Sequence, residues 1–278
     1  MLCKAALRRR LLEILPEIKW IDGFSNYVEE RATNFVSGIT PDLYEKEYRE
    51  GAGGELNWEI RNGNRCPPKM NALHSSSALV VNSFAPWKLH LNELRLCDSL
   101  GFCSLRFEAK VPTGLGGTPP HLDFLAESPS SSVAAESKLT EYLRPHQTNF
   151  APAYSHKSWP PAVEPYLIMM RYLQENPSTF VYLDGAQLVK HALGLASRFD
   201  QHNVRLLYLF WEPENSGSYR DFDIHHKEIE QFSRTVTGAS INFKWKTYLE
   251  LWEEWAQGDS TWLQLHASEL RKRYALTI

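Results

Sequence analysis

Two acidic residues and a lysine are spaced so that their side chains could form a reactive site. Asp123 is followed thirteen residues later by Glu136, Ser137 and Lys138, which gives the pattern D…ExK. In an extended strand, residues i and i+2 point to the same side, so the side chains of Glu136 and Lys138 would share one face. Such a pair is either a surface ion pair, contributing about 0 to 1 kcal/mol when exposed, or part of a reactive site.

The reactive interpretation requires a cation. Two neighbouring carboxylates repel each other by about 4 kcal/mol at an effective dielectric constant of about 20, so a site that keeps both ionised needs a positive ion between them. Oxygen ligands select a hard ion such as Mg²⁺, with Mn²⁺ as the alternative. The ion would polarise a phosphodiester oxygen and activate a bound water, while Lys138 would orient that water or stabilise negative charge. This chemistry is that of a metal-dependent phosphodiesterase.

Three predicted strands would bring these residues together. Residues 105–111 and 121–127 alternate apolar and polar side chains, and residues 133–139 continue the pattern after a serine-rich turn. Short, turn-rich connections predict an antiparallel meander. The meander would place Asp123 on the second strand close to Glu136 on the third.

The rest of the chain predicts a mixed α/β core. Residues 1–50 show helical spacing of apolar side chains, serines cap a helix that runs into Pro86, and Asp184 caps another. We expect further elements as follows: helices at 166–176 and 185–199, buried strands at 180–183 and 204–211, a strand at 241–246, and a capping box of Thr247 and Glu250 before two carboxyl-terminal helices.

The segments "PPHLDF" and "AAESKLTEYL" resemble the PD-(D/E)xK nuclease superfamily, although His121 and Leu122 separate Pro120 from Asp123. More closely, five segments in this order look like a little-characterised, mainly prokaryotic group of restriction-endonuclease-like proteins: "ELNW", "LHSSSALVVNSFAPW", "LDFLAE", "ESKLTEYL" and "YLDGAQLVKHALGL". The similarity spans roughly residues 51–212. It implies a restriction-endonuclease-like α/β core, in which helices flank a mixed central sheet with an antiparallel meander.

The resemblance also implies roles for individual residues. Asp123 and Glu136 would be metal ligands, the Ser137 carbonyl a backbone ligand, and Lys138 the catalytic lysine. Gln187 would correspond to a glutamine often found on the helix after the motif. A further acidic ligand would be Glu55 or Glu108.

Simpler structural roles compete for several of these residues. Gln187 fits a D-x-x-Q cap with Asp184, in which the glutamine reaches back to the cap's backbone amide. Glu108 alternates with two basic residues, which favours a solvated strand face. Four further side chains would either contact nucleic acid or serve structure: on the helix after Asp184, Lys190 and His191 would face phosphate or lie on an exposed face, and in the proline-rich loop at 144–165, Tyr154 and Lys157 would contact bases and phosphates or pack against the core.

Composition excludes few classes of function. The formal net charge of −3 over 278 residues argues against an indiscriminately basic, histone-like surface. The four cysteines form no CxxC pair and are too few for a disulfide scaffold, so a reducing cytoplasm is the simplest compartment. No stretch of eighteen apolar residues is present, and no membrane partner is expected.

Together these patterns predict an amino-terminal helical extension at residues 1–50 and a nuclease domain at 51–278, with carboxyl-terminal strand and helices. The expected activity is that of a Mg²⁺-dependent deoxyribonuclease, where DNA rather than RNA is implied by the resemblance alone. The alternatives are a catalytically inactive nucleic-acid-binding or assembly module with the same fold, and a hydrolase of smaller phosphate esters. A homodimer would suit double-strand cutting.

Overall fold

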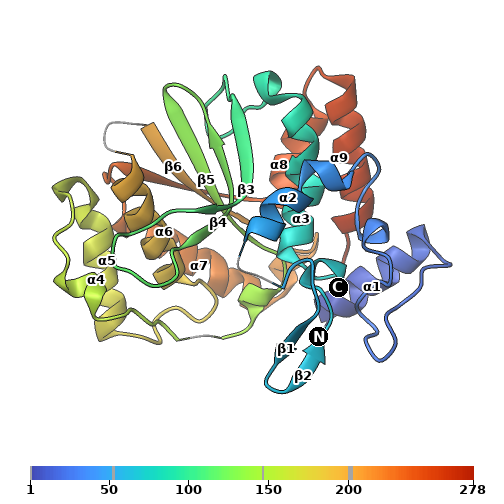
Figure 1. The fold of residues 1–278 in the computed structure, drawn as a ribbon, viewed down its shortest axis with the longest axis horizontal. Coiled ribbons are helices and arrows are strands. Elements are labelled where there is room, and N and C mark those ends of the chain that lie inside the picture. The colour runs from blue at the N-terminus through green and yellow to red at the C-terminus, as the bar shows by residue number, and fades with distance from the viewer. Residues whose placement is uncertain (1, 52–53, 146, 200–202) are drawn as a thin grey trace.

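The centre of the protein is a five-stranded sheet that combines antiparallel and parallel pairs (Figure 1). The computed structural model describes residues 2–51, 54–145, 147–199 and 203–278. Three antiparallel strands, β3, β4 and β5, are followed by β6 and β7, which run parallel to β5. In sheet order the strands are β3 Ser104–Lys110, β4 His121–Glu127, β5 Ser131–Lys138, β6 Asn203–Phe210 and β7 Ile241–Thr247. The predicted α/β fold with a mixed sheet and an antiparallel meander is confirmed.

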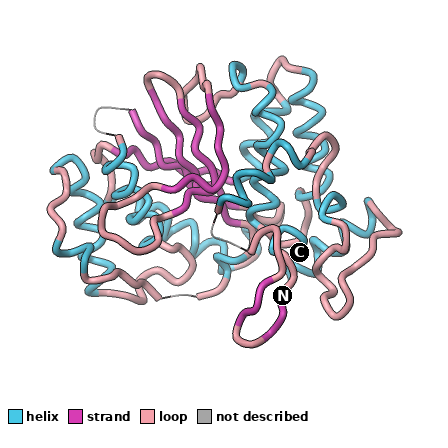
Figure 2. The backbone as a smooth tube through the Cα atoms, viewed as in Figure 1, coloured by secondary structure: helices cyan, strands magenta, loops and turns pink. Residues whose placement is uncertain are grey.

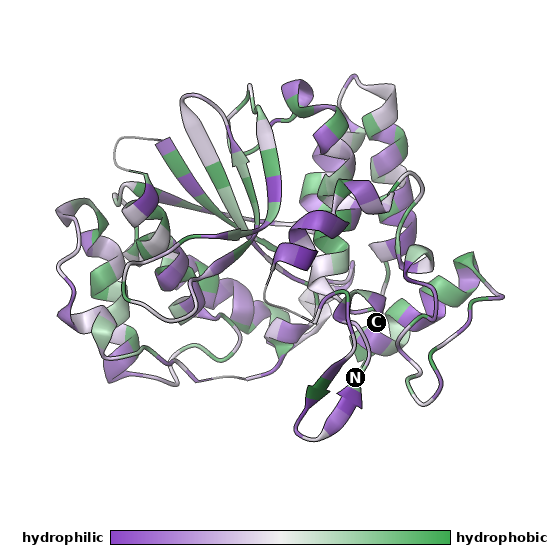
Figure 3. Cartoon of the chain, in the orientation of Figure 1, coloured by the Kyte–Doolittle hydropathy of each residue, from purple (hydrophilic) through white to green (hydrophobic). Residues whose placement is uncertain are grey.

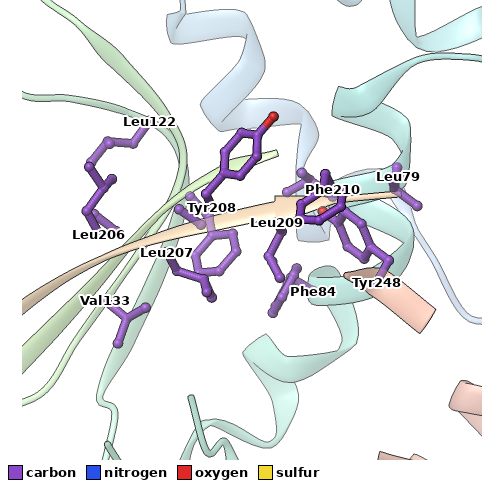
Figure 4. Close-up of a cluster of buried hydrophobic side chains, with 14 of the residues drawn as sticks. Leu79, Phe84, Leu122, Val133, Leu206, Leu207, Tyr208, Leu209, Phe210 and Tyr248 are labelled. Carbon is purple, nitrogen blue, oxygen red and sulfur yellow. The ribbon is translucent and has the colours of Figure 1, made fainter. Parts of the chain in front are cut away.

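β6 lies between two strands, as its continuous apolar sequence predicted. On one face of the sheet, the rings of Tyr208 and Phe210 lie 5.7 and 4.8 Å from the ring of His225. Figure 4 shows Leu79, Phe84 and Tyr248 around the carboxyl-terminal half of β6. Both faces of this strand are therefore covered, and the core extends through the sheet rather than along one side of it.

Helices form a layer on each face of the sheet, as the tube view shows (Figure 2). On the face that carries Tyr208, α5, α6 and α7 pack together, and α6 and α7 contact β6 and β7. On the other face, α3 contacts β4 and β5, and α8 contacts β7 and α9. The bounds of these helices are α3 Ser76–Phe84, α5 Glu164–Glu175, α6 Gly185–Arg198, α7 Arg220–Thr235, α8 Tyr248–Ala256 and α9 Thr261–Tyr274.

Local sequence signals place several of these helices. The Ser75 hydroxyl accepts a hydrogen bond from the Ala78 amide at 3.1 Å, which starts α3 as predicted. Thr247 and Glu250 form the predicted capping box at the start of α8. The short helices are α4 Ala153–His156, and the 3₁₀ turns η1 Arg31–Asn34, η2 Pro41–Leu43, η3 Lys69–Asn71, η4 Ala85–Leu89, η5 Leu91–Glu93, η6 Glu141–Leu143, η7 Pro161–Val163 and η8 Ser216–Ser218.

The amino-terminal region is only partly helical. α1 (Leu2–Ile14) packs against α9, and α2 (Glu45–Glu50), a largely hydrophilic helix, contacts β3 (Figure 3). The prediction of helix throughout residues 1–50 is wrong for the segment between them, where the chain forms turns and an isolated bridge between Trp20 and Val28. Pro16 and a glycine turn at positive φ interrupt the helical pattern there.

The strand predicted at 180–183 is also absent from the described structure. A carboxylate takes the place of a neighbouring strand: Glu228 on α7 accepts the backbone N–H groups of Val181, Tyr182 and Leu183 at 2.5, 2.9 and 2.9 Å. Because every buried N–H group needs an acceptor but any acceptor will serve, the apolar sequence alone could not distinguish these arrangements.

A small hairpin lies outside the central sheet. β1 (Glu59–Arg61) pairs with β2 (Asn64–Cys66) through the turn Asn62–Gly63, whose φ angles are +50° and +76°. An Asn-Gly pair between short strands is a strong hairpin signal that the sequence analysis did not use.

Hydrogen bonds of one buried asparagine join distant parts of the fold. The Asn82 side chain on α3 accepts from the Val36 amide at 2.8 Å and donates to the Asn34 carbonyl at 3.0 Å. It also donates to the Tyr274 hydroxyl on α9 at 2.8 Å. The amino-terminal segment is thus tied to both α3 and the carboxyl-terminal helix. In the described part of the chain, no helix has the length and apolar character needed to cross a bilayer.

Candidate active site

Lys138, the last residue of β5, holds two acceptors that lie far apart in the sequence. Its Nζ atom donates to Glu136 Oε1 at 2.5 Å and to Gln187 Oε1 at 2.9 Å. Gln187 is in the first turn of α6, and its backbone N–H donates to the capping Asp184 carboxylate at 2.8 Å. Asp184 therefore caps the helix as predicted, but the Gln187 side-chain oxygen faces β5 rather than the cap.

His191 engages the second oxygen of the same glutamate. Its Nε2 lies 2.8 Å from Glu136 Oε2, and the residue is only 1% exposed. An exposed helix face is therefore the wrong interpretation for His191. Lys190 behaves differently, because its Nζ donates to the Asn149 carbonyl at 2.6 Å and lies over the Phe150 ring. Gln187 and His191 share a face through their i, i+4 spacing, a signal that the sequence analysis overlooked.

Asp123 lies on β4 just beyond the last paired residues of the β4–β5 ladder. Its Oδ2 accepts the backbone N–H of Ser137 at 2.7 Å, which fixes the carboxylate against β5. Burial, followed by the negative charge of Glu136, raises the pKa of Asp123 well above its ordinary value, although Lys138 opposes the shift. Asp123, Glu136 and Lys138 thus interact electrostatically, as the meander predicted.

Glu108 is not on a solvated strand face, and this expectation from alternation is corrected. Its φ angle is +49°, which is rare for a residue with a side chain, and it interrupts the β3–β4 ladder opposite Asp123. Its Oε2 lies 3.2 Å from His121 Nδ1. Burial and then the charges of Glu55 and Glu136 raise the pKa of Glu108 to about 7. Glu108 is therefore a partly buried acid with other carboxylates as neighbours.

Glu55 completes the group. It is 8% exposed, and its Oε1 accepts from Lys69 Nζ at 2.7 Å. Its charge acts on the pKa of Glu108, so the two carboxylates are neighbours in the electrostatic sense. We call the following four residues the acidic cluster: Glu55, Glu108, Asp123 and Glu136.

The acids of this cluster divide by their counter-charges. Burial acts to raise the pKa of Glu136, but the charge of Lys138 and the hydrogen bonds of His191 and Lys138 outweigh it and lower this pKa to about 2. Burial likewise opposes the charged form of Lys138, yet Glu136 and then Glu141 raise its pKa above the ordinary value. Glu136 and Lys138 are therefore a charged pair, whereas burial and neighbouring carboxylates favour the protonated forms of Asp123 and Glu108.

The acidic cluster also bears on whether the site could hold a metal ion. Within the residues that the structure describes, no group of three or more His, Cys, Asp and Glu side chains is arranged to hold one. The chemistry of the donor set nevertheless fits a hard cation, because carboxylate oxygens supply it and a cation would offset the neighbouring negative charges that, after burial, raise the pKa values of Asp123 and Glu108. A cation that bound Glu136 would compete with Lys138 and His191 for its oxygens.

The proline-rich loop lies beside the site. Tyr154 helps to line a pocket of about 500 Å³ together with Gln187, Lys190 and His191. Lys157 does not line it, since its Nζ donates to the Thr113 carbonyl and lies 4.3 Å from the centre of the Trp159 ring. Contacts with the β3–β4 connection and with Trp159 account for Lys157, while Tyr154 lines the pocket beside α6.

Comparison with known proteins identifies a family for this architecture. Residues 2–275 match the family described as restriction endonuclease associating with ARP. Searches of curated proteins and of solved structures find no match. Since the family match covers nearly the whole chain and the mixed sheet is consistent with a restriction-endonuclease-like core, this protein belongs to the family of restriction endonucleases associating with ARP.

Proposed function

We propose that this protein is a nuclease of the PD-(D/E)xK type that hydrolyses phosphodiester bonds in DNA with the help of Mg²⁺ or Mn²⁺. The observation that carries the proposal is the position of Lys138, which contacts Glu136 and Gln187 and interacts electrostatically with Asp123. The family match supports an activity of the nuclease type.

The acidic cluster would hold the cation. Asp123 and Glu136 would supply side-chain oxygens, and the Ser137 carbonyl a backbone oxygen. Glu108 suits the role of the additional ligand better than Glu55, because Glu55 already binds the Lys69 ammonium. When bound, the ion would polarise the scissile phosphate and lower the pKa of a water molecule.

The neighbouring side chains would orient these groups. With its raised pKa, Lys138 stays protonated at neutral pH, so it would donate hydrogen bonds and stabilise negative charge rather than accept a proton. Gln187 positions the Lys138 ammonium, and His191 positions the Glu136 carboxylate. DNA would approach from the side of the pocket that Tyr154 borders.

One observation favours a second function. Both oxygens of Glu136 are already engaged, which is the arrangement expected of a closed ionic network in a catalytically inactive binding or assembly module. The family description, which mentions association with ARP, is compatible with an assembly role as well.

A plasmid assay separates the two functions. Supercoiled DNA is incubated with the protein and Mg²⁺ or Mn²⁺, beside Asp123→Ala, Glu136→Ala, Lys138→Ala and the exposed control Glu175→Ala on α5. We expect metal-dependent nicking that falls by at least about 100-fold in the three site variants and is unchanged in the control. Linearisation without prior nicking would indicate a homodimer acting on both strands.

Three outcomes would count against the proposed metal-dependent site or against cleavage itself. Nicking that survives all three site substitutions, or that persists in excess chelator, would rule out the proposed site. DNA binding without any cleavage under either metal would favour the inactive module. A parallel incubation with RNA of the same sequence determines which polynucleotide is preferred.

A further inference from the structure

A second pocket, distinct from the one beside Tyr154, opens at the amino-terminal end of α3. Its volume is about 510 Å³, and its walls come from α1, residues 26–27, β1, the segment that leads into α3 and the segment that follows β5. Thr140 in its wall is two residues beyond Lys138, and Lys69 in its wall binds Glu55 of the acidic cluster. We call it the α3 pocket. It therefore adjoins the candidate active site.

Positive charge converges on the α3 pocket from four segments of the chain. Lys4 comes from α1 and makes no ion pair with a described residue, and Arg61, Lys69 and Arg144 come from three other segments. The acid in the wall is Glu141, whose Oε2 accepts the amide N–H groups of Leu139 and Thr140. Arg61 and Lys69 also pair with Glu59 and Glu55, which do not line the pocket, so the cations in the wall outnumber the acid there.

The effect of this charge is visible on its neighbours. Burial, followed by the charges of Lys4 and Arg144, lowers the pKa of His74 to about 4. Burial and the charge of Arg144 also lower the pKa of Lys4. Cations held this close together favour an anion between them.

Hydrogen-bond donors point to the same conclusion. α3 has nine residues, and its first turn carries Ser76 and Ser77, which line the pocket. The amide N–H groups of these two serines make no hydrogen bond to a described residue, whereas the next amide, that of Ala78, is capped by Ser75. Free N–H groups and the positive end of the helix dipole are the features that bind phosphate at helix N-termini.

An independent observation comes from Thr140, in the segment that follows β5. Thr140 is only 6% exposed, and its hydroxyl has no hydrogen-bond partner in the described part of the chain. The Nδ1 atom of His74, in the same pocket, is also buried without a partner among the described residues. Because a buried polar atom without a partner is costly, these groups indicate a ligand that would satisfy them.

We propose that the α3 pocket binds the terminal phosphate of a nucleic acid strand next to the cleavage centre. The inference rests on the proposed function for its substrate class. A terminal phosphate carries a charge of about −1.5 to −2 and three free oxygens, whereas an internal phosphodiester carries one charge and continues in two directions. Several cations and donors from different segments of the chain match the terminal group. The pocket would hold a strand end and fix the distance from that end to the bond that is cut.

Binding tests this without any need for cleavage. Dye-labelled 12-nucleotide DNA strands carrying a 5′-phosphate, a 3′-phosphate or hydroxyls at both ends are titrated with the full-length protein in chelator, and fluorescence anisotropy is recorded. We expect one phosphorylated strand to bind at least about 10-fold more tightly than the hydroxyl strand, and the arm that does so identifies the end. Lys4→Gln should abolish this preference, Lys4→Arg should retain it, and the exposed control Lys19→Gln should leave it unchanged.

A second measurement does not depend on DNA. Inorganic phosphate added to the protein should raise the pKa of the His74 imidazole, followed by NMR, because a bound dianion offsets the charges of Lys4 and Arg144. Equal affinity for all three strands, or no change in the His74 pKa with phosphate, would overturn the inference. A preference for a phosphorylated end without plasmid cleavage would overturn the nuclease alone, and cleavage without such a preference would overturn the pocket alone.

Discussion

Lys138 makes the central contacts of the candidate site. It is buried, and it is kept charged by Glu136 at 2.5 Å and by the Gln187 oxygen at 2.9 Å. Removing one partner of a buried pair leaves the other charge uncompensated and costs about 3 to 5 kcal/mol. Loss of nicking in Lys138→Ala is therefore informative only beside a melting curve, and Gln187→Leu, which removes a neutral acceptor, is the gentler probe of the same position.

His74 makes stability depend on pH. Burial and the charges of Lys4 and Arg144 lower its folded pKa to about 4, and the ring of Tyr27 packs on it edge-on. Since the unfolded pKa is about 6.5, the unfolded chain binds a proton first as the pH falls, and the contribution present above pH 6.5 is lost between there and about pH 4.

We expect His74→Gln to remove this part of the pH dependence. Between pH 7 and pH 4.5, its free energy of unfolding, measured with urea, should fall by about 2 to 3 kcal/mol less than that of the unchanged protein. The exposed control His156→Gln should follow the unchanged protein. Parallel pH profiles for all three proteins would show that His74 titrates normally.

At the residue scale, alternation predicted some contacts and misled about others. The i, i+2 rule placed Glu136 beside Lys138, and the structure has that contact. The same rule put Glu108 on a solvated face with Arg106 and Lys110, because alternation groups residues by face but does not show what covers that face. Gln187 was ambiguous for another reason. Its backbone N–H donates to the capping Asp184, while its side-chain oxygen accepts from Lys138, so the residue takes part both in the helix cap and in the candidate site.

Among the elements, α6 packs unusually closely on the sheet. Gly194 faces the end of β3, where a Cβ atom would lie 2.5 Å from the Val111 carbonyl oxygen and 3.0 Å from its Cγ2. The glycine is therefore needed for the position of the helix that carries Gln187 and His191.

Gly194→Ala is expected to destabilise the protein by about 1 to 3 kcal/mol, although alanine is the better helix former, because backbone must move to admit the methyl group. Gly217→Ala is the matched control, since no atom of the described residues lies within 4 Å of the position that its methyl group would take. Thermal melts of both variants report the difference. A Gly194→Ala protein as stable as the control would mean that α6 can shift freely, and the contacts of Gln187 would then need no fixed helix.

Strands were predicted correctly where the pattern of side chains showed which faces of the strand are buried. The meander followed from alternation and turns, and β6 followed from an apolar run that only a doubly covered strand can bury. It failed at 180–183, where a carboxylate of α7 satisfies the backbone from 45 or more positions away in the sequence. The sequence of residues 180–183 contains no signal for its contact with Glu228.

On the scale of the whole molecule, the amino-terminal region is integrated with the rest. Cys3, Ala6 and Leu7 of α1 belong to the same hydrophobic core as the sheet. Asn82 joins this region to α9. The division into an extension at 1–50 and a domain at 51–278 stays a prediction, and these contacts argue that the two parts fold together.

Asn82→Ala tests that integration. It would leave the Val36 amide and the Asn34 carbonyl without partners in the core, so the free energy of unfolding should fall by about 3 kcal/mol. Denaturant unfolding should stay a single transition when followed by fluorescence and by circular dichroism. The exposed control Asn92→Ala should be close to neutral. Two separate transitions in the unchanged protein would instead support an independent extension.

The order of the strands also determines when the site can exist. β5 and β6 are neighbours in the sheet, but α6, which supplies Gln187 and His191, lies between them in the sequence. During synthesis, α6 is therefore added to the chain after Lys138. A polypeptide that has been synthesised only as far as the meander contains Lys138 and Glu136. It lacks Gln187 and His191 of α6, which contact them. The candidate site is thus incomplete until synthesis has passed α6, so the cleavage that we propose would require a chain that includes this helix.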